Sequence, residues 1–213
     1  MNALDTFCKA GGATKGLQQA GFHVTGVDIE DQANYCGDLF VKGDALDFIE
    51  RYGKEFDFIW ASPVCKRYSQ CTPKAYRGNH PDQIAPVREK LQATGRPFVI
   101  ENVPSAAKLL HRPVMLCGSM FSLGIRRHRF FEVAGFEVPM RWPCSHKKSP
   151  VLITGTHRRT YEPRYEYTVQ QCRDASGLNW MTRAELDQAI PPAYARFLGE
   201  AVAVELARCG LRR

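Results

Sequence analysis

Short apolar runs alternate with helical stretches over the first hundred residues of this chain. The runs at residues 4–7, 24–28 and 97–100 have the length of strands, and each leads into polar or small residues. Residues 13–20 and 84–93 have helical spacing instead. Because parallel strands must be joined by crossover helices, this alternation predicts an α/β fold, a mostly parallel twisted sheet with helices on both faces.

The length and the amino-acid composition are typical of a single globular domain. The chain has 213 residues, 44% hydrophobic and 24% charged, which is enough to bury a core. No stretch approaches the roughly 18 apolar residues of a membrane helix, and no signal peptide is visible at the N-terminus. We therefore expect a cytoplasmic protein whose eight cysteines are reduced rather than paired in disulfides.

Changes in composition along the chain predict three structural regions. Residues 1–136 carry the strand and helix alternation and form the core. Residues 137–175, punctuated by prolines and aromatic residues, form a small basic lobe. Residues 176–213 are helical, with a helix opening at Pro191-Pro192, running through Cys209 and ending at Gly210 as its C-cap, and they complete the core.

Positive charge is concentrated in one stretch. The formal net charge is +7, and residues 126–164 hold nine Lys and Arg against three acidic residues. Such a stretch is typical of a phosphate-binding surface, although a solvated charged face remains the alternative. The charge therefore favours an acidic partner.

Cys65 follows an apolar run at residues 57–61 and comes directly after Ser62-Pro63-Val64. Ligands of open α/β sheets bind beyond the carboxyl ends of the strands, so a thiol there is a candidate nucleophile. A small buried packing residue is the alternative for any single cysteine.

Upstream, a glycine pair and two acidic residues stand at successive strand ends. Gly11-Gly12 links a strand to a helix, where the backbone can approach a ligand closely. Asp28 is suited to accept hydrogen bonds from ribose hydroxyls, and Asp44 from an adenine amine. The series predicts an adenosine-type cofactor; a simple turn with two helix caps is the alternative.

Downstream, Glu101 ends a buried strand, where desolvation suits a carboxyl group to hold a proton. An N-cap or an ion-paired acid is the alternative. In Arg127-His128-Arg129, strand alternation places the two arginines on one face and His128 on the other. Two converging arginines are suited to anchor a base or a phosphate.

Together these features resemble the DNA cytosine-5 methyltransferases, in that family's motif order. Residues 5–12 resemble its cofactor loop and residues 62–69 its Pro-Pro-Cys-Gln-x-Phe-Ser nucleophile loop. Glu101-Asn102-Val103 matches its Glu-Asn-Val, and Arg127-His128-Arg129 its Arg-x-Arg. Residues 189–195 resemble the Ala-Val-Pro-Pro segment that folds back on the cofactor loop. The resemblance covers nearly the whole chain and implies a Rossmann-like, S-adenosylmethionine-dependent methyltransferase fold.

The resemblance also implies a reaction, methyl transfer from S-adenosylmethionine to C5 of cytosine in DNA. Cys65 would add to C6 of a flipped base while Glu101 donates to N3, and Arg127 and Arg129 would hold the base carbonyl and its surroundings. The implied cofactor site comprises Asp5, Phe7, Gly11, Gly12, Asp28, Ile29, Asp44, Ala45, Pro63, Gln188 and Ala189. The implied substrate site comprises Ser62, Lys66, Ser69, Asn102, Lys147, Lys148, Arg158 and Arg159.

Several positions depart from the family pattern. Val64 replaces a proline, which loosens the nucleophile loop, and Lys66 replaces a glutamine, where it can lower the thiol pKa or grip a phosphate. Lys9 replaces the first glycine of the cofactor loop, and Asp187-Gln188 a Gly-Asn pair. The region for target recognition is short, so we expect relaxed specificity in a monomer, or a partner that supplies specificity, in a restriction-modification or phage setting.

Two alternatives for the function stay open. The substrate can be RNA or single-stranded nucleic acid, or the chain can be a catalytically impaired module that binds S-adenosylmethionine or DNA. A zinc site at Cys144 and His146, with His157 and Cys172, fits no common ligand spacing, and we predict no metal. Cys117 is interpreted as a packing residue.

Overall fold

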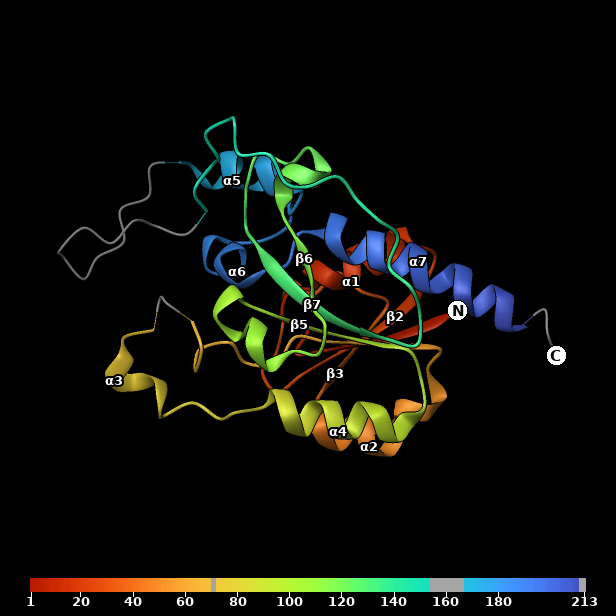
Figure 1. Ribbon diagram of the computed structural model, residues 1–213. Helices are drawn as coiled ribbons and strands as arrows, with labels where there is room; N and C mark the ends of the chain where they lie inside the picture. Colours follow the sequence, from red (N-terminus) through yellow and green to blue (C-terminus); the bar gives the residue numbers. More distant parts are fainter. Residues whose placement is uncertain (70–71, 154–166, 211–213) are drawn as a thin grey trace.

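The predicted α/β sheet is confirmed by a computed structural model, which describes residues 1–69, 72–153 and 167–210. Seven strands form one sheet in the order β3-β2-β1-β4-β5-β7-β6 (Figure 1). Strands β1 to β5 run parallel, and β7 is antiparallel to both of its neighbours. The strands are β1 (Asn2–Thr6), β2 (His23–Asp28), β3 (Leu39–Lys42), β4 (Phe58–Ala61), β5 (Phe98–Asn102), β6 (Val114–Leu116) and β7 (Arg129–Ala134).

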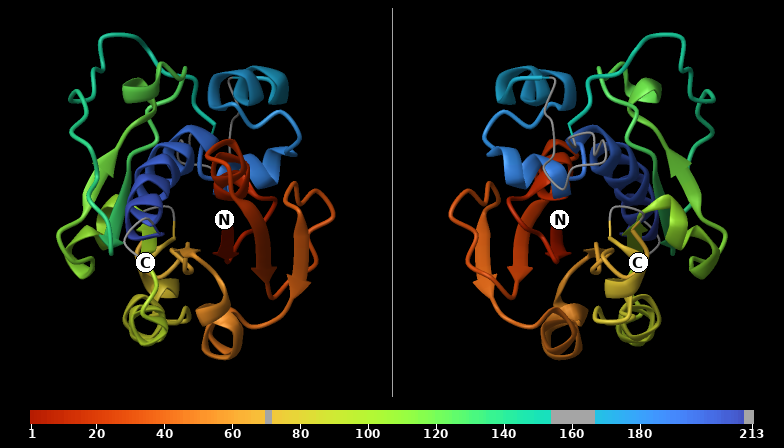
Figure 2. Two further views of the ribbon diagram at one scale, coloured as in Figure 1. Left: turned by 90° about the vertical axis from the view of Figure 1, so that its right-hand side faces the viewer. Right: turned by 90° about the vertical axis from the view of Figure 1, so that its left-hand side faces the viewer.

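Helices cover both faces of this sheet. On one face α1 and α7 pack side by side, and on the other lie α2 and α4 (Figures 1 and 2). The helices are α1 (Gly12–Gln19), α2 (Ala45–Tyr52), α3 (Lys74–Arg77), α4 (Ile84–Thr94), α5 (Val169–Ser176), α6 (Arg183–Gln188) and α7 (Pro192–Gly210). Among the described residues, no helix combines the length and the apolar character that crossing a membrane needs.

The core has a layer on each side of the sheet because successive strand side chains point to opposite faces. Phe58 and Trp60 of β4 pack with the α1 and α7 layer, whereas Ile59 and Ala61 pack with the α2 and α4 layer. All four are fully buried. A central parallel strand is covered on both faces, which explains the continuous apolar run seen in the sequence.

Two elements differ from the sequence prediction. Helix α7 includes Gly210, so the predicted C-cap lies inside the helix by one residue. Helix α5 spans the boundary predicted at residue 175, and it packs with the α6 region in a third apolar cluster. The division into a core, a basic lobe and a C-terminal segment stays a prediction.

The strand order reverses between β1 and β4. The chain leaves β1 toward β2 and β3, and then returns to β4 on the other side of β1. In open α/β sheets such a switch point opens a crevice beyond the carboxyl ends of the two strands. The glycine loop follows β1 and the Cys65 loop follows β4, so the fold brings both to this crevice.

Candidate active site

A cleft of about 1120 Å³ occupies the switch point. It is lined by all four predicted catalytic residues, Cys65, Glu101, Arg127 and Arg129. It is also lined by most of the predicted binding residues, which are Asp5, Phe7, Gly12, Asp28, Ile29, Asp44, Ala45, Ser62, Pro63, Lys66, Ser69, Gln188 and Ala189. Residues scattered over more than 180 positions of sequence therefore face one space.

The glycine loop fits closely against the C-terminal segment. Gly11, the N-cap of α1, has φ of 84°, a left-handed conformation that favours glycine. A Cβ on Gly12 would overlap the carbonyl oxygen of Ile190 and lie 3.1 Å from its nitrogen. The segment around Ile190 thus folds back onto this loop, as the resemblance implied.

Asp5, at the end of β1, presents a buried carboxyl group beside the loop. The Thr14 hydroxyl donates to its Oδ2 at 2.5 Å, while its Oδ1 is buried without a hydrogen-bond partner among the described residues. Burial raises the pKa of Asp5 to about 7, against the hydrogen bonding from Thr14 that lowers it. The unpartnered oxygen is an acceptor that a ligand in the cleft can satisfy.

Asp28 is engaged by Lys9. Its Oδ2 accepts from the backbone N–H of Lys9 at 3.1 Å, and its Oδ1 lies 3.3 Å from Lys9 Nζ. Lys9 Nζ also donates to Glu30 at 2.8 Å. A ribose that binds Asp28 must therefore share the carboxylate with the ammonium group that replaces the family's glycine.

Asp44 has two roles. Its Oδ1 accepts from the backbone N–H groups of Leu46 and Asp47 at 2.8 and 3.0 Å, so it caps α2. It also lines the cleft. The helix-cap alternative and the cofactor-site prediction are therefore compatible at this residue.

The Cys65 loop is held by contacts from two other elements. Asn102 Nδ2 donates to the Pro63 carbonyl at 3.1 Å. The Val64 N–H donates to Gln83 Oε1 at 3.2 Å. The Cys65 carbonyl accepts from the backbone N–H groups of residues 68 and 69, at 2.9 and 2.8 Å, so the chain turns directly after the thiol.

Glu101 and Arg129 form a buried ion pair in the cleft. Arg129 Nε lies 3.1 Å from Glu101 Oε1, and the two side chains are only 15% and 7% exposed. Arg127 donates to the Asp187 carbonyl at 2.6 Å, and its Nε has no hydrogen-bond partner in the part of the chain that the structure describes. Its φ of 34° is unusual for a residue other than glycine. The unused Nε is a donor available to a ligand.

Electrostatics couple these groups. Burial raises the pKa of Glu101 above the ordinary glutamate range, although Arg129 and Arg127 oppose the shift. Burial also raises the pKa of the Cys65 thiol, as does the negative charge of Glu101, while the arginines lower it. Holding Glu101 protonated therefore favours the thiolate at Cys65.

Several predicted residues lie elsewhere. Asn102 is fully buried and does not line the cleft, and its side-chain amide forms hydrogen bonds to the backbone of Pro63 and Val103. Gly11 does not line the cleft either. Lys147 and Lys148 are exposed and are not among the lining residues. Arg158 and Arg159 fall outside the described residues.

Sequence reasoning missed other lining residues, notably Gln83, Ile190 and the carbonyl of Asp187 that holds Arg127. Gln83 precedes a helix and carries no local signal of its contact with Val64. Asp187 stands out in the sequence only as a departure from the family motif. These contacts join residues far apart in sequence, so no spacing pattern marks them.

The whole architecture matches a solved methyltransferase. Entamoeba histolytica methyltransferase EhMeth covers 97% of this chain and 98% of its own, with a TM-score of 0.55 at 12% sequence identity. The chain has the Rossmann-like fold of S-adenosylmethionine-dependent methyltransferases.

Two further structures match over 62% of this chain. One is a prophage-encoded E. coli protein assigned as a DNA modification methyltransferase (TM-score 0.43, 20% identity). The other is the Dnmt2 methyltransferase of S. pombe (TM-score 0.42, 18% identity). The chain spans 45% and 48% of these two proteins. No family model and no curated protein matches the sequence.

Proposed function

We propose that this chain is an S-adenosylmethionine-dependent methyltransferase that acts on C5 of cytosine in DNA. The observation that carries the proposal is the meeting of Cys65 with the Glu101–Arg129 pair in one cleft, beside the glycine loop. Methyl transfer to C5 of cytosine needs three groups, which are a nucleophile, a buried proton donor and a guanidinium group.

The residues of the cleft fit the cofactor that the fold implies. Asp5 Oδ1 is a buried acceptor without a partner among the described residues, and it suits the ammonium or hydroxyl groups of such a ligand. Phe7 and Ile29 offer apolar contact, and Asp28 and Asp44 offer carboxylates. When bound, the cofactor supplies an electrophilic methyl group.

Cys65 and Glu101 would activate the base together. The Cys65 thiolate forms a bond to C6 of cytosine while the Glu101 carboxyl group gives its proton to N3, so that C5 becomes nucleophilic. After methylation, solvent water takes the C5 proton, the bond from sulfur to C6 breaks so that Cys65 leaves as the thiolate, and N3 returns its proton to Glu101. Each residue ends the cycle in its starting state.

The arginines have separate tasks. Arg129 pairs with Glu101 and fixes its orientation. Arg127 lines the cleft, and its Nε has no hydrogen-bond partner among the described residues, so it would hold the carbonyl oxygen of the base. Cys65 lies within the cleft, and because a base stacked in a duplex cannot reach a thiol there, the base would leave its stack.

Trapping on 5-fluorocytosine tests the proposal, because fluorine at C5 cannot leave as a proton and the adduct persists. The chain would be offered fluorinated duplex DNA, single-stranded DNA and RNA with the methyl donor. We expect a denaturation-resistant adduct on duplex DNA that disappears in Cys65→Ser. The matched control, Cys209→Ser, changes an exposed cysteine on α7 and should retain it.

Other outcomes are equally informative. An adduct on RNA or single-stranded DNA alone would change the substrate class while keeping the chemistry. The absence of any adduct from a chain that still binds the donor would refute the catalytic proposal and leave a binding module.

A further inference from the structure

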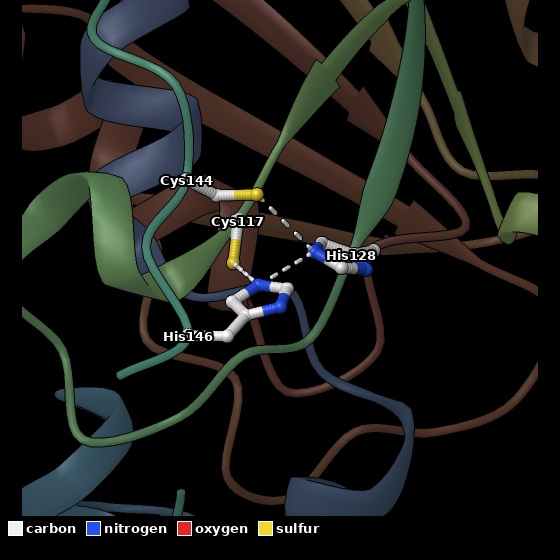
Figure 3. A group of neighbouring side chains, drawn as sticks. All are labelled: Cys117, His128, Cys144 and His146. Carbon is white, nitrogen blue, oxygen red and sulfur yellow. Dashed lines mark hydrogen bonds between the residues drawn. The ribbon is translucent and has the colours of Figure 1, made fainter. Parts of the chain in front are cut away.

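Four side chains that can bind a metal converge outside the cleft (Figure 3). Cys117 follows β6, His128 precedes β7, and Cys144 and His146 lie in an irregular segment at residues 137–150. One ligand atom from each lies within 4.8 Å of the others. None of the four lines the cleft, so within the described chain this Cys/His cluster is a separate site.

Three of the six distances between the ligand atoms are close to the edges of a tetrahedron around one ion, and all four atoms lie within 4.8 Å of one another. His128 Nε2 lies 3.2 Å from His146 Nε2. The two sulfur-to-nitrogen distances are 3.5 Å, from Cys117 to His146, and 3.8 Å, from Cys144 to His128. With zinc bonds of about 2.0–2.1 Å to nitrogen and about 2.3 Å to sulfur, tetrahedral edges are about 3.3 Å between nitrogens and about 3.6 Å between nitrogen and sulfur.

The types of the four ligand atoms indicate which metal they would bind. Two thiolates and two imidazoles are the ligands of closed structural zinc sites. Without an ion, the two facing imidazole nitrogens share a single hydrogen and the thiols are weak donors, whereas one metal ion would bind all four groups at once. We propose that Cys117, His128, Cys144 and His146 bind one structural zinc ion.

The surroundings of the cluster are built to support it. The Ser119 hydroxyl lies 3.2 Å from the Cys117 sulfur and also accepts from the Ser145 N–H at 3.1 Å. Arg126 donates to the His146 carbonyl at 3.1 Å. Such outer contacts orient metal ligands and limit their freedom.

The site would tie the basic segment to the catalytic strand. Residues 137–150 form no helix or strand, so few backbone bonds fix them. His128 stands between Arg127 and Arg129, which line the cleft while His128 turns to the cluster. A zinc ion here would anchor the exposed Lys147 and Lys148 at a fixed distance from the cleft.

This set differs from the one that the sequence alone offers. Cys144 and His146 are shared, but Cys172 packs in the apolar cluster near α6, where Arg183 donates to its sulfur at 3.0 Å. His157 lies outside the described residues. The proposal thus replaces the prediction of no metal, and it moves Cys117 from a packing residue to a ligand.

Metal analysis of the purified chain tests the site without any assay of methylation. We expect about one zinc ion per chain after dialysis. Cys144→Ser and His146→Asn should each lose it, and Cys209→Ser, a matched cysteine variant on the far helix, should keep it. Because a ligand variant can fail to fold, cobalt exchange into the unaltered chain is the second measurement, and it should give the strong visible and thiolate charge-transfer bands of a tetrahedral site.

Three results would overturn the proposal. The first is an unaltered chain that holds no zinc and gives no thiolate band with cobalt. The second is full zinc retention in folded Cys144→Ser. The third is loss of zinc in Cys172→Ser together with retention in Cys144→Ser, which would assign the metal to the other ligand set.

Discussion

Gly16 tests whether the contact between α1 and α7 shapes the cofactor side of the cleft. Gly16 does not line the cleft, but a Cβ at this position would overlap the carbonyl oxygen of Pro192. It would also lie 2.7 Å from the Arg196 nitrogen and 2.8 Å from the Ala195 Cβ. Gly16→Ala therefore forces backbone, not a flexible side chain, to move.

The cost follows from that geometry. Restoring ordinary contact requires α7 to retreat by about 1 Å, and overpacking of this kind costs about 1–3 kcal/mol, here at the upper end because backbone opposes it on α7. Alanine in a helix recovers about 1 kcal/mol relative to glycine. The net loss of about 2 kcal/mol lowers Tm by roughly 4–8 °C for a chain of this size.

Donor binding should fall as well. The segment that lines the cleft at Gln188 and Ala189 leads directly into Pro192, so retreat of α7 carries it away from the glycine loop. We expect the Kd for S-adenosylhomocysteine to rise on the order of tenfold, about 1.4 kcal/mol. Differential scanning fluorimetry and isothermal titration calorimetry measure the two effects.

Gly78→Ala is the matched control. Gly78 has φ of −62° and ψ of −22°, and nothing lies within 4 Å of an added Cβ. Its Tm should stay level or rise slightly, since alanine reduces the entropy of the unfolded chain by about 0.4–1 kcal/mol. A Gly16→Ala variant with the Tm and donor affinity of the unaltered chain would refute the reasoning.

Three other substitutions each test a single contact. Lys9→Gly frees Asp28 from its ammonium partner and should tighten donor binding up to about fivefold by calorimetry, about 0.2–1 kcal/mol; weaker binding would contradict this. Glu101→Gln removes a negative charge that raises the pKa of the Cys65 thiol, so the midpoint of the pH profile for Cys65 alkylation should move to lower pH. An unchanged midpoint would contradict the electrostatic coupling of Glu101 and Cys65. Arg88→Ala removes the ion pair of the buried Glu132 carboxylate on β7, which keeps the backbone N–H of His111 as a hydrogen-bond donor, and this should cost about 3–5 kcal/mol in urea unfolding; a loss under 1 kcal/mol would count against it.

Local patterns in the sequence predict where several candidate residues lie in the fold. Strand ends are visible because an apolar run stops, so the sequence alone places Asp28 and Glu101 at the carboxyl edge of the sheet. Parallel strands share that edge, and the presence of both acids at one edge follows from this rule alone.

The parts that depend on contacts between distant segments could not be predicted. Strand β6 is only three residues long, too short for a periodic signal. The Cys/His cluster joins Cys117 to His146 across three segments, and only the antiparallel pairing of β6 with β7 brings the first two of these together.

The nucleophile loop shows how a departure from a family pattern can be compensated elsewhere. Val64 lacks the rigidity of proline, but its N–H donates to Gln83, a bond that proline cannot make. Asn102 holds the Pro63 carbonyl, and the Ser105 hydroxyl donates to the Tyr68 carbonyl at 2.6 Å. Three contacts from outside the loop thus fix it on either side of the thiol. Valine at this position therefore does not leave the loop unsecured, and the departure from proline is no argument against the proposed role of Cys65.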